Sequence, residues 1–596
     1  MKKILEIFLV IVIVLIMSWG AVLLLSQKPL KEETASPSIS GEFAAPLPFP
    51  AVPMPSLEEP VRDIRKEQSR NESRVLFSGR VVDEQGNPAP GVSLRLYRHQ
   101  DLFFKFDLMD ERLSFVDPGH ETVSNARGDF LLQDFPEGIF RLEVKSTEYA
   151  NYWMAPSFSI KKGIPFTDME IVVHKGEPLK GIVLNPAGEP VPDARVFYSM
   201  QGEISTFYDQ AFSGNEGHFI FPHIPPGKNL SIMASKKGFA PVVLYPLPTP
   251  RSSSELLEIE LSDPISLEGR VFSSDGAPAA NAEILPKVTV KAGEEKRILG
   301  FAPVKSDEQG IFKLNDLPPG DLRLLVRGNA GDRTHEKNLK LEAGSIQPEL
   351  TIQLQKGNSI SGVVVDDTGT TLSGALVYFH GMDIFNSAIT GKDGVFNLSG
   401  VGEGKKNIFA LAHDKALVKI TDVEPGTGNL SIVLHSGASV TGTVCAQSTN
   451  QPLKNARISV LSGDLRSPES ITNRLGIYQA HFLPEANSAS LMASAKGFAS
   501  AKSRDLDLKP GSSHIVDFFL RIGGSISGHV WEEGTGIPIQ GVSVHDFSPH
   551  YFEPIHTDEN GFFRAEHIPS GSESLSVTRE GYITPRARQF LIKEGE

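Results

Sequence analysis

FSGRVVDEQGNP, residues Phe77 to Pro88, opens a pattern that recurs six times along the 596-residue chain. In every copy an apolar residue lies two positions before the first glycine, and a valine lies two positions after it. The residue just before the glycine is polar in all six, so apolar and polar side chains alternate. This period of two predicts a β-strand with one buried face. The six glycines are Gly79, Gly181, Gly269, Gly362, Gly442 and Gly528.

A turn follows this strand, usually in the form Gly-x-Pro, as at Gly86 to Pro88. Three residues beyond the proline position each copy has Gly, Asp or Asn, which predicts a backbone with positive φ at that point. A second alternating strand comes next. The six positions with predicted positive φ are Gly91, Asp193, Asn281, Gly374, Asn455 and Gly541.

A hairpin motif marks the second half of each copy: NARGDF, GNEGHF, DEQGIF, GKDGVF, NRLGIY and DENGFF. Asn, Asp or Gly begins the motif, glycine is fourth and an aromatic residue is sixth. This pattern indicates a tight turn whose outgoing strand sends an aromatic ring into the core. Copies one to five close with EIVV, LEIEL, LTIQL, LSIVL and VDFFL. The sixth copy has no obvious closing strand unless QFLI, residues 589–592, serves.

Each copy therefore has about seven short strands in roughly 80–100 residues, which predicts a β-sandwich. The Gly-x-Val strand, the Gly-x-Pro turn and the Asp-x-x-Gly-x-Phe hairpin resemble the carboxypeptidase regulatory-like domain. That family is a small prealbumin-like (transthyretin-like) sandwich, related to the starch-binding-like and collagen-binding B-type folds. The resemblance spans residues 74–596. It implies an all-β fold of six tandem small Ig-like or prealbumin-like modules, and it is weak evidence for activity because sandwiches have many unrelated functions.

The pattern divides the chain into an N-terminal part and six modules. Residues 1–27 are predicted as a signal anchor or transmembrane helix, and residues 28–73 as a proline-rich stalk with a charged linker. The six modules are predicted at residues 74–175, 176–262, 263–355, 356–436, 437–522 and 523–596. Short junctions such as HKGEP and SDP favour a semi-rigid string of modules, which would extend roughly 200 Å.

An apolar run from Ile4 to Leu25 contains Glu6 as its one charged residue. A helix needs about 20 apolar residues to cross a bilayer, more than the core of a cleaved signal peptide. The run predicts an uncleaved signal anchor, with cleavage as the alternative. Lys2 and Lys3 favour a cytoplasmic N-terminus, although lysines beyond the run weaken that argument. We expect a single-pass membrane protein whose repeats are extracytoplasmic, in the periplasm or at the cell surface.

Charge and cysteine content exclude several classes of function. The net charge is −14 and no block of Lys or Arg follows the apolar run, so we expect no nucleic-acid partner. Cys445 is the single cysteine, which excludes an intramolecular disulfide and a thiolate metal site. Cys445 lies in the strand-like run VTGTVCAQ, so we expect its side chain to pack in a sheet as a small apolar residue.

HTDENGFF, from His556 to Phe563, raises the question of a metal because metallocarboxypeptidases hold zinc with His-x-x-Glu. Other copies have Val, Phe, Lys or Ile at the place of His556 and varied residues at the place of Glu559, so we interpret the stretch as a hairpin. The cluster of His545, His550, Glu553 and His556 is a weaker metal candidate, for which solvated loop histidines are the simpler interpretation. Calcium is disfavoured because NARG and NRLG fill the place of the acidic turns without carboxylates.

In metallocarboxypeptidases the resembling domain is an accessory to a separate catalytic domain, and this chain has no room for such a domain. We therefore predict no catalytic residue, no metal and no cofactor. An enzyme with an unfamiliar site in one divergent module is a third class of function that stays open.

Carbohydrate binding is the main alternative to a scaffold role, because of the kinship with starch-binding-like folds. Sugar sites on sandwiches typically use exposed aromatic platforms, and the run YANYWMAPSF begins at residue 149. Tyr149, Tyr152 and Trp153 are the candidate ligand surface. The alternative is that these rings cover a loop-rich end of the sandwich.

The leading hypothesis is a non-enzymatic, membrane-anchored scaffold, adhesion or spacer protein of the cell envelope, which is expected to be bacterial. Its expected partners are the membrane, through the N-terminal helix, and an envelope protein or a polysaccharide. The runner-up is a carbohydrate-binding envelope protein.

Overall fold

A computed structural model of the chain describes residues 75–98, 119–154, 157–201, 205–225, 227–249, 256–293, 295–328, 332–333, 335–344, 349–379, 386–462, 465–466, 469–546, 555–568 and 571–593. These residues contain β-strands and no α-helix, so the all-β prediction is confirmed. The predicted signal anchor and stalk lie outside them. Within the described ranges no helix is long and apolar enough to cross a membrane.

The strands of the first three modules follow the predicted order. The first module has β1 (Leu76–Val82), β2 (Ser93–Arg98), β3 (His120–Val123), β4 (Asp129–Gln133), β5 (Gly138–Lys145), β6 (Tyr152–Met154), β7 (Phe158–Ile160) and β8 (Phe166–Val172). The second has β9 (Glu177–Leu184), β10 (Arg195–Gln201), β11 (Ser205–Phe212), β12 (His218–Ile224), β13 (Gly227–Ser235), β14 (Val242–Thr249) and β15 (Leu257–Glu260). The third has β16 (Ile265–Phe272), β17 (Glu283–Ala292), β18 (Glu295–Gly300), β19 (Val304–Lys305), β20 (Ile311–Leu317), β21 (Gly320–Arg327), β22 (Asp332–Arg333), β23 (His335–Leu341), β24 (Leu350–Gln353) and β25 (Gln355–Lys356).

The fourth and fifth modules again have a first strand, a second strand, a hairpin and a closing strand, and the sixth has the first three of these. The fourth has β26 (Asn358–Asp366), β27 (Leu376–Phe379), β28 (Ser387–Ile389), β29 (Val395–Val401), β30 (Lys406–Leu411), β31 (Val418–Val423) and β32 (Leu430–Leu434). The fifth has β33 (Ala438–Ala446), β34 (Arg457–Ser462), β35 (Leu465–Arg466), β36 (Ser470–Ile471), β37 (Ile477–Leu483), β38 (Ala486–Ser494), β39 (Ala501–Lys502), β40 (Leu506–Leu508), β41 (Ser513–Ile515) and β42 (Phe518–Leu520). The sixth has β43 (Gly524–His529), β44 (Ser543–Asp546), β45 (Ile555–His556), β46 (Phe562–Ile568), β47 (Gly571–Thr578) and β48 (Arg588–Ile592).

The fourth module shows the sandwich in its simplest form. Its first strand, β26, is the centre of a three-stranded sheet, between the antiparallel hairpin strand β29 and the parallel closing strand β32. The facing sheet has the order β28-β27-β30-β31. Ile360 and Val364, on the inner face of β26, are completely buried between the two sheets, as the alternation predicted.

The predicted positive φ values are confirmed. Asp193, Asn281 and Asn455 have φ of 49°, 57° and 57°, and Gly91, Gly374 and Gly541 fill the same place in the other modules with φ from 69° to 76°. A left-handed residue here lets the chain leave the turn and enter the second strand. The restriction to Gly, Asp and Asn is therefore a requirement of the backbone.

The first two modules share one sheet, which the repeat pattern did not predict. Strand β11 of the second module pairs antiparallel with β6 of the first, through Ser205–Met154, Thr206–Trp153 and Phe207–Tyr152. The resulting nine-stranded sheet runs β14-β13-β10-β11-β6-β5-β2-β3, with β7 joined to β5. Most of the buried apolar side chains of both modules belong to one continuous hydrophobic core.

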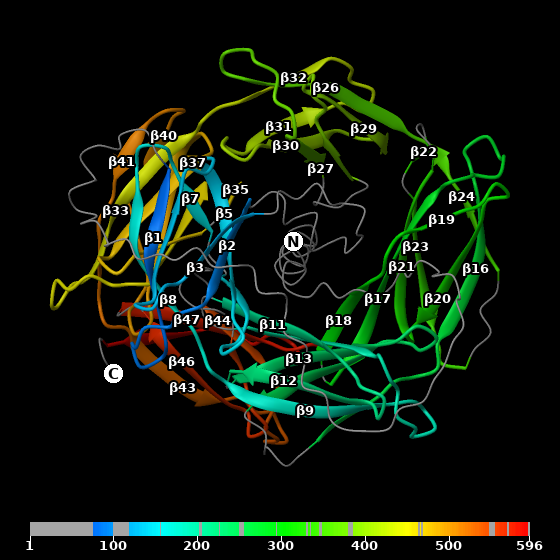
Figure 1. The fold of residues 1–596 in the computed structure, drawn as a ribbon, viewed down its shortest axis with the longest axis horizontal. Helices are drawn as coiled ribbons and strands as arrows, with labels where there is room; N and C mark the ends of the chain where they lie inside the picture. Colours follow the sequence, from blue (N-terminus) through cyan, green and yellow to red (C-terminus); the bar gives the residue numbers. More distant parts are fainter. Residues whose placement is uncertain are drawn as a thin grey trace.

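The modules do not form an extended string. Figure 1 shows the first five running once around a ring, from the blue strands of the first module to the yellow strands of the fifth. The ring closes where β7 of the first module packs on β37 of the fifth, with Ser159 Oγ bonded to the carbonyl of Gln479 and to the amide of His481. Short junctions restrict the angle between neighbours, but they do not by themselves determine whether the array is straight or closed.

The sixth module differs from the others in one respect. Its first strand, β43, belongs to a two-stranded sheet with β46, and no closing strand lies on its other side among the described residues. Strand β48 contains the QFLI segment, but it pairs with β47 in the facing sheet. QFLI therefore does not serve as the closing strand.

Candidate functional site

The stretch that raised the zinc question forms a β-turn. Asp558 Oδ1 accepts hydrogen bonds from the amides of Asn560 and Phe562, each at 2.9 Å, and the Gly561 amide donates to the Asp558 carbonyl. Glu559 is exposed at the tip of this turn. These hydrogen bonds to the backbone account for an acidic residue at the start of the turn.

The second metal candidate is only partly within the described residues. His545 lies on β44 and His556 on the neighbouring strand β45, whereas His550 and Glu553 fall outside. Burial lowers the pKa of His545. Across the described ranges no group of three or more His, Cys, Asp or Glu residues could hold a metal ion.

A buried hydroxyl recurs just before the hairpin turn in every module, and sequence reasoning missed it. In the fifth module Thr472 Oγ1 accepts a hydrogen bond from the Ala456 amide at 2.8 Å and donates to the Leu453 carbonyl at 2.6 Å. The hydroxyl thereby joins the hairpin to the turn before the second strand. The equivalents are Ser124, Ser213, Ser306, Thr390 and Thr557. If the alignment of the six hairpin motifs is extended by one residue toward the N-terminus, a Ser or Thr appears in every copy.

The predicted ligand surface of Tyr149, Tyr152 and Trp153 is divided between two faces of a sheet. Tyr152 lies in the core, where its hydroxyl donates to the Val172 carbonyl at 2.8 Å and its pKa is raised by burial. Trp153, the next residue of β6, faces the opposite side, and Tyr149 is half-buried against the core. The structure brings Trp153 together with Tyr97 and Tyr208 instead.

The Trp153 cluster surrounds a carboxylate. The Trp153 ring stacks on Tyr208, with centroids 6.2 Å apart and planes at 24°, and lies 5.2 Å from Tyr97. Both tyrosine hydroxyls donate to Glu143, and Lys145 Nζ lies 3.0 Å from its Oε1. Burial first, and then the Glu143 charge, raise the pKa of Tyr208 well above 10. Trp153 is 8% exposed, so this cluster is not an open aromatic platform.

The contact between the first and fifth modules is rich in polar pairs. The Arg474 amide donates to the Asp168 carbonyl and its guanidinium to the Asp168 carboxylate, both at 2.9 Å. Lys454 Nζ lies 2.5 Å from Glu170 Oε1. Further bonds run from Asn473 Nδ2 to the Thr167 carbonyl, from Gln479 Nε2 to the Pro165 carbonyl and from the Ser157 amide to the Glu469 carbonyl.

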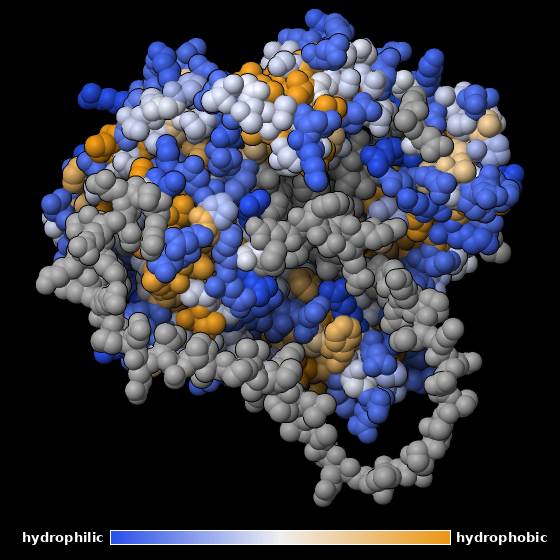
Figure 2. Space-filling view, turned by 45° about the horizontal axis from the view of Figure 1, so that its top comes forward, coloured by the Kyte–Doolittle hydropathy of each residue, from blue (hydrophilic) through white to orange (hydrophobic). Residues whose placement is uncertain are grey.

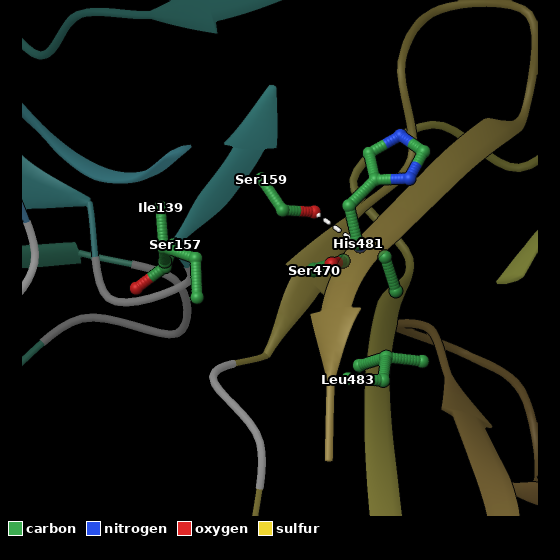
Figure 3. Close-up of a pocket in the computed structure, with 7 residues that line it drawn as sticks. Ile139, Ser157, Ser159, Ser470, His481 and Leu483 are labelled. Carbon is green, nitrogen blue, oxygen red and sulfur yellow. Dashed lines mark hydrogen bonds between the residues drawn. The ribbon is translucent and has the colours of Figure 1, made fainter. Parts of the chain in front are cut away.

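His481 lies at the centre of this contact. Figure 3 shows Ser159 pointing toward the His481 backbone, whose amide donates to Ser159 Oγ at 2.9 Å. Both residues line a cavity of about 10 Å³ together with Ile139, Ser157, Ser470 and Leu483. That volume suits about one water molecule and excludes a larger ligand. His481 Nδ1 lies 2.9 Å from Ser439 Oγ, and burial, with a smaller effect of Lys161, lowers the pKa of His481 to about 4. The neutral imidazole is therefore the form that fits the contact.

The surface holds several exposed apolar side chains. Figure 2 shows a mostly hydrophilic face with small separate hydrophobic patches. The sixth module contributes Trp531, Ile537, Ile583 and Leu591, of which Trp531 is 58% exposed. The Trp531 ring stacks on His529, with centroids 5.4 Å apart and planes at 12°. This exposed ring pair was not among the predicted ligand residues.

Comparisons with solved structures give weak likenesses. The TIE protein of Bacillus anthracis is 13% identical over 76% of this chain and 68% of its own, with a TM-score of 0.14. A streptococcal ancillary pilin is 13% identical over 48% of this chain and 99% of its own, with a TM-score of 0.17. GBS52, the minor pilin of Streptococcus agalactiae, is 14% identical over 30% of this chain and 96% of its own, with a TM-score of 0.19. These scores are too low to support a statement about function.

Comparison with curated proteins finds no significant match. Comparison with protein families does find a match. The family model of the carboxypeptidase regulatory-like domain matches residues 439–521, which span β33 to β42 of the fifth module. The fifth module thus matches the family model of this domain, and the described residues of the chain form tandem β-sandwich modules.

Proposed function

We propose that the protein is a non-enzymatic scaffold or adhesion protein outside the cytoplasm, held to the membrane by its N-terminal apolar segment. The ring contact between the first and fifth modules supports the scaffold part of this proposal, and the apolar run from Ile4 to Leu25 supports the membrane attachment. Lys454, Arg474 and Gln479 each pair across the ring contact, so modules about 300 residues apart are held in one fixed arrangement. A fixed frame of small sandwiches presents its loops in defined directions, as a scaffold requires.

The location is tested by fusing alkaline phosphatase, which is active only outside the bacterial cytoplasm, to the C-terminus of the full-length chain. We expect an active fusion in the membrane fraction. Deletion of residues 1–27 should abolish phosphatase activity and membrane association together. An active cytoplasmic reporter at the same position, such as β-galactosidase, would contradict the proposed location.

Carbohydrate binding is a second candidate, favoured by the exposed stack of Trp531 on His529. Such a ring offers the flat apolar face that sugar rings use. A glycan array with the full-length protein tests it, with Trp531→Ala as the variant and the exposed Ile583→Ala as the matched control. Binding that Trp531→Ala alone removes would favour this candidate, and an array without any signal would eliminate it.

A further inference from the structure

We propose that the surface of the fifth module that closes the ring also binds the first module of a second copy of this chain, so that two copies close each other's rings. Two surfaces take part: the clasp, residues 157–170 of the first module, and the hairpin face, residues 469–481 of the fifth module together with Lys454. The proposal gives the scaffold a partner, and its setting at a membrane rests on the proposed function.

Three positions of the hairpin face are covered in the fifth module and exposed in the other five. Ile471 is 1% exposed and belongs to the hydrophobic core of the first two modules. The same contrast holds for Asn473 and Gln479, which are 4% and 8% exposed. The fold of a single module leaves these positions in solvent, so their burial marks a binding surface. The exposed equivalents of Ile471 are Val123, Phe212, Lys305, Ile389 and His556.

The hairpin face recognises both the backbone and the charge of the clasp. The carbonyl groups of residues 165, 167 and 168 accept hydrogen bonds from it. The acidic Asp168 and Glu170 face Arg474 and Lys454. The backbone bonds require the extended shape of this segment, and the ion pairs require acidic residues at these two places. A second copy of the chain carries the same segment, so it meets both requirements.

The clasp and the hairpin face are different surfaces at opposite ends of the five-module ring. A contact between unlike surfaces can close within one chain, or it can join the first module of one copy to the fifth module of another. Two copies that close each other form two clasp contacts, as two separate rings do. Exchange between copies therefore keeps every bond of the contact, which is why domain swapping is a low-cost route to a dimer.

The ring can open where neighbouring modules have separate hydrophobic cores. The apolar cluster of the fourth module consists of its own residues, and so does the cluster of the fifth. No shared apolar cluster of the described residues therefore spans the junction at residues 355–358. His413 of the fourth module also packs on the first module, against Phe140, with ring centroids 4.8 Å apart. The fourth and fifth modules should thus move together, and a second copy would take over both contacts.

Concentration decides between the closed single copy and the exchanged pair. A short junction gives a contact within one chain an effective concentration in the millimolar range. Closed single copies should therefore prevail in dilute solution. Copies that are held in one membrane are confined to a plane, and this confinement raises their local concentration and favours exchange.

Two charge-altered proteins test the contact between copies. The first carries Lys454→Glu with Arg474→Glu in the hairpin face. The second carries Asp168→Asn with Glu170→Lys in the clasp, and asparagine suits the φ of 59° at residue 168. Native mass spectrometry should show each full-length protein alone as a monomer. Their equimolar mixture should form a one-to-one complex, at least about tenfold tighter than the self-association of either protein.

The mixture should associate because both of its contacts are complementary. The unaltered clasp of the first protein meets the unaltered hairpin face of the second, and the two altered surfaces meet with opposite charges. The matched control carries all four substitutions in one chain, where the altered surfaces attract each other within the ring, so it should remain a monomer at the same concentration. All four side chains are at least partly exposed, and hydrogen exchange of β2 and β34 checks that each protein is folded.

The unaltered protein provides an independent test. A carbodiimide links an amine directly to a carboxylate, and Lys454 Nζ lies 2.5 Å from Glu170 Oε1. When light and heavy-isotope copies are treated together at about 0.5 mM, near the effective concentration of the junction, we expect Lys454–Glu170 links that join light to heavy peptides.

Two results would overturn the proposal. The first is a mixture of the altered proteins that associates no more than either protein alone. The second is a set of Lys454–Glu170 links that join only peptides of the same isotope. An inactive phosphatase fusion would instead contradict the proposed location at the membrane, and it would leave both of these measurements unaffected.

Discussion

At the scale of single residues, the repeated hydroxyl shows how a local motif holds a whole module together. Thr472 is completely buried, and its one hydroxyl satisfies both the Ala456 amide and the Leu453 carbonyl. Thr472→Val keeps the shape and leaves both groups without that partner, which should lower the stability of the fifth module by about 2 kcal/mol. Hydrogen exchange of β34 measures the loss. Thr472→Ser, the residue found in the first three modules, is the control and should cost less than half as much.

His481 should make the ring contact sensitive to pH. Its pKa is lowered from 6.5 to about 4 in the folded protein. As pH falls below 6.5, the separated form takes up a proton and the closed form does not, so the stability of the contact declines until about pH 4. Between pH 7.5 and pH 5 the loss should be on the order of 2 kcal/mol.

Unfolding of the first and fifth modules at the two pH values, with and without His481→Gln, checks this expectation. The variant should lack the pH-dependent part of the loss. His514→Gln, in the same module and outside the contact, is the control. If His481→Gln retains the full pH dependence, titratable groups other than His481 must cause it.

At the scale of elements, Glu143 joins strands of two modules. It accepts hydrogen bonds from Tyr97 on β2 and Tyr208 on β11, although it is only 5% exposed. Glu143→Leu should leave both hydroxyls and Lys145 without this partner and lower stability by about 2–3 kcal/mol. Faster hydrogen exchange of β6 and β11 would show that the shared sheet has loosened. Glu121→Leu, which removes an exposed partner of Arg95, should cost less than about 1 kcal/mol.

The strands that repeat were predictable, and those that join modules were not. The alternation around Gly79 and the turn at Gly128 appear in every copy, so the copies act as controls for one another. Strand β6 occurs once, and nothing in the sequence indicates that Phe207 and Tyr208 of the neighbouring strand β11 pack on its Tyr152 and Trp153. Pairing between modules depends on which edge strand meets which, and a local period of two does not contain that information.

At the scale of the whole molecule, ring closure depends on pairs that are far apart in the sequence. Lys454 and Arg474 of the fifth module face Glu170 and Asp168 of the first. A sequence pattern reports local periodicity, so the extended string was the natural expectation and the ring was not. The same reasoning explains why His481, which looks like any strand residue, was not selected as a contact residue.

Charge reversal should open the ring. Lys454→Glu with Arg474→Glu places like charges at both pairs and should increase the maximum dimension of the full-length protein in small-angle X-ray scattering. Each exposed pair is worth about 0–1 kcal/mol, so both are reversed together. Adding Glu170→Lys should return the dimension toward the compact value, because attraction returns in the opposite sense at that pair; Asp168 is left unchanged because its φ of 59° disfavours lysine. Lys509→Glu, which disrupts an ion pair within the fifth module, is the control. An equal dimension for the reversed and restored proteins would mean that these pairs do not hold the ring closed.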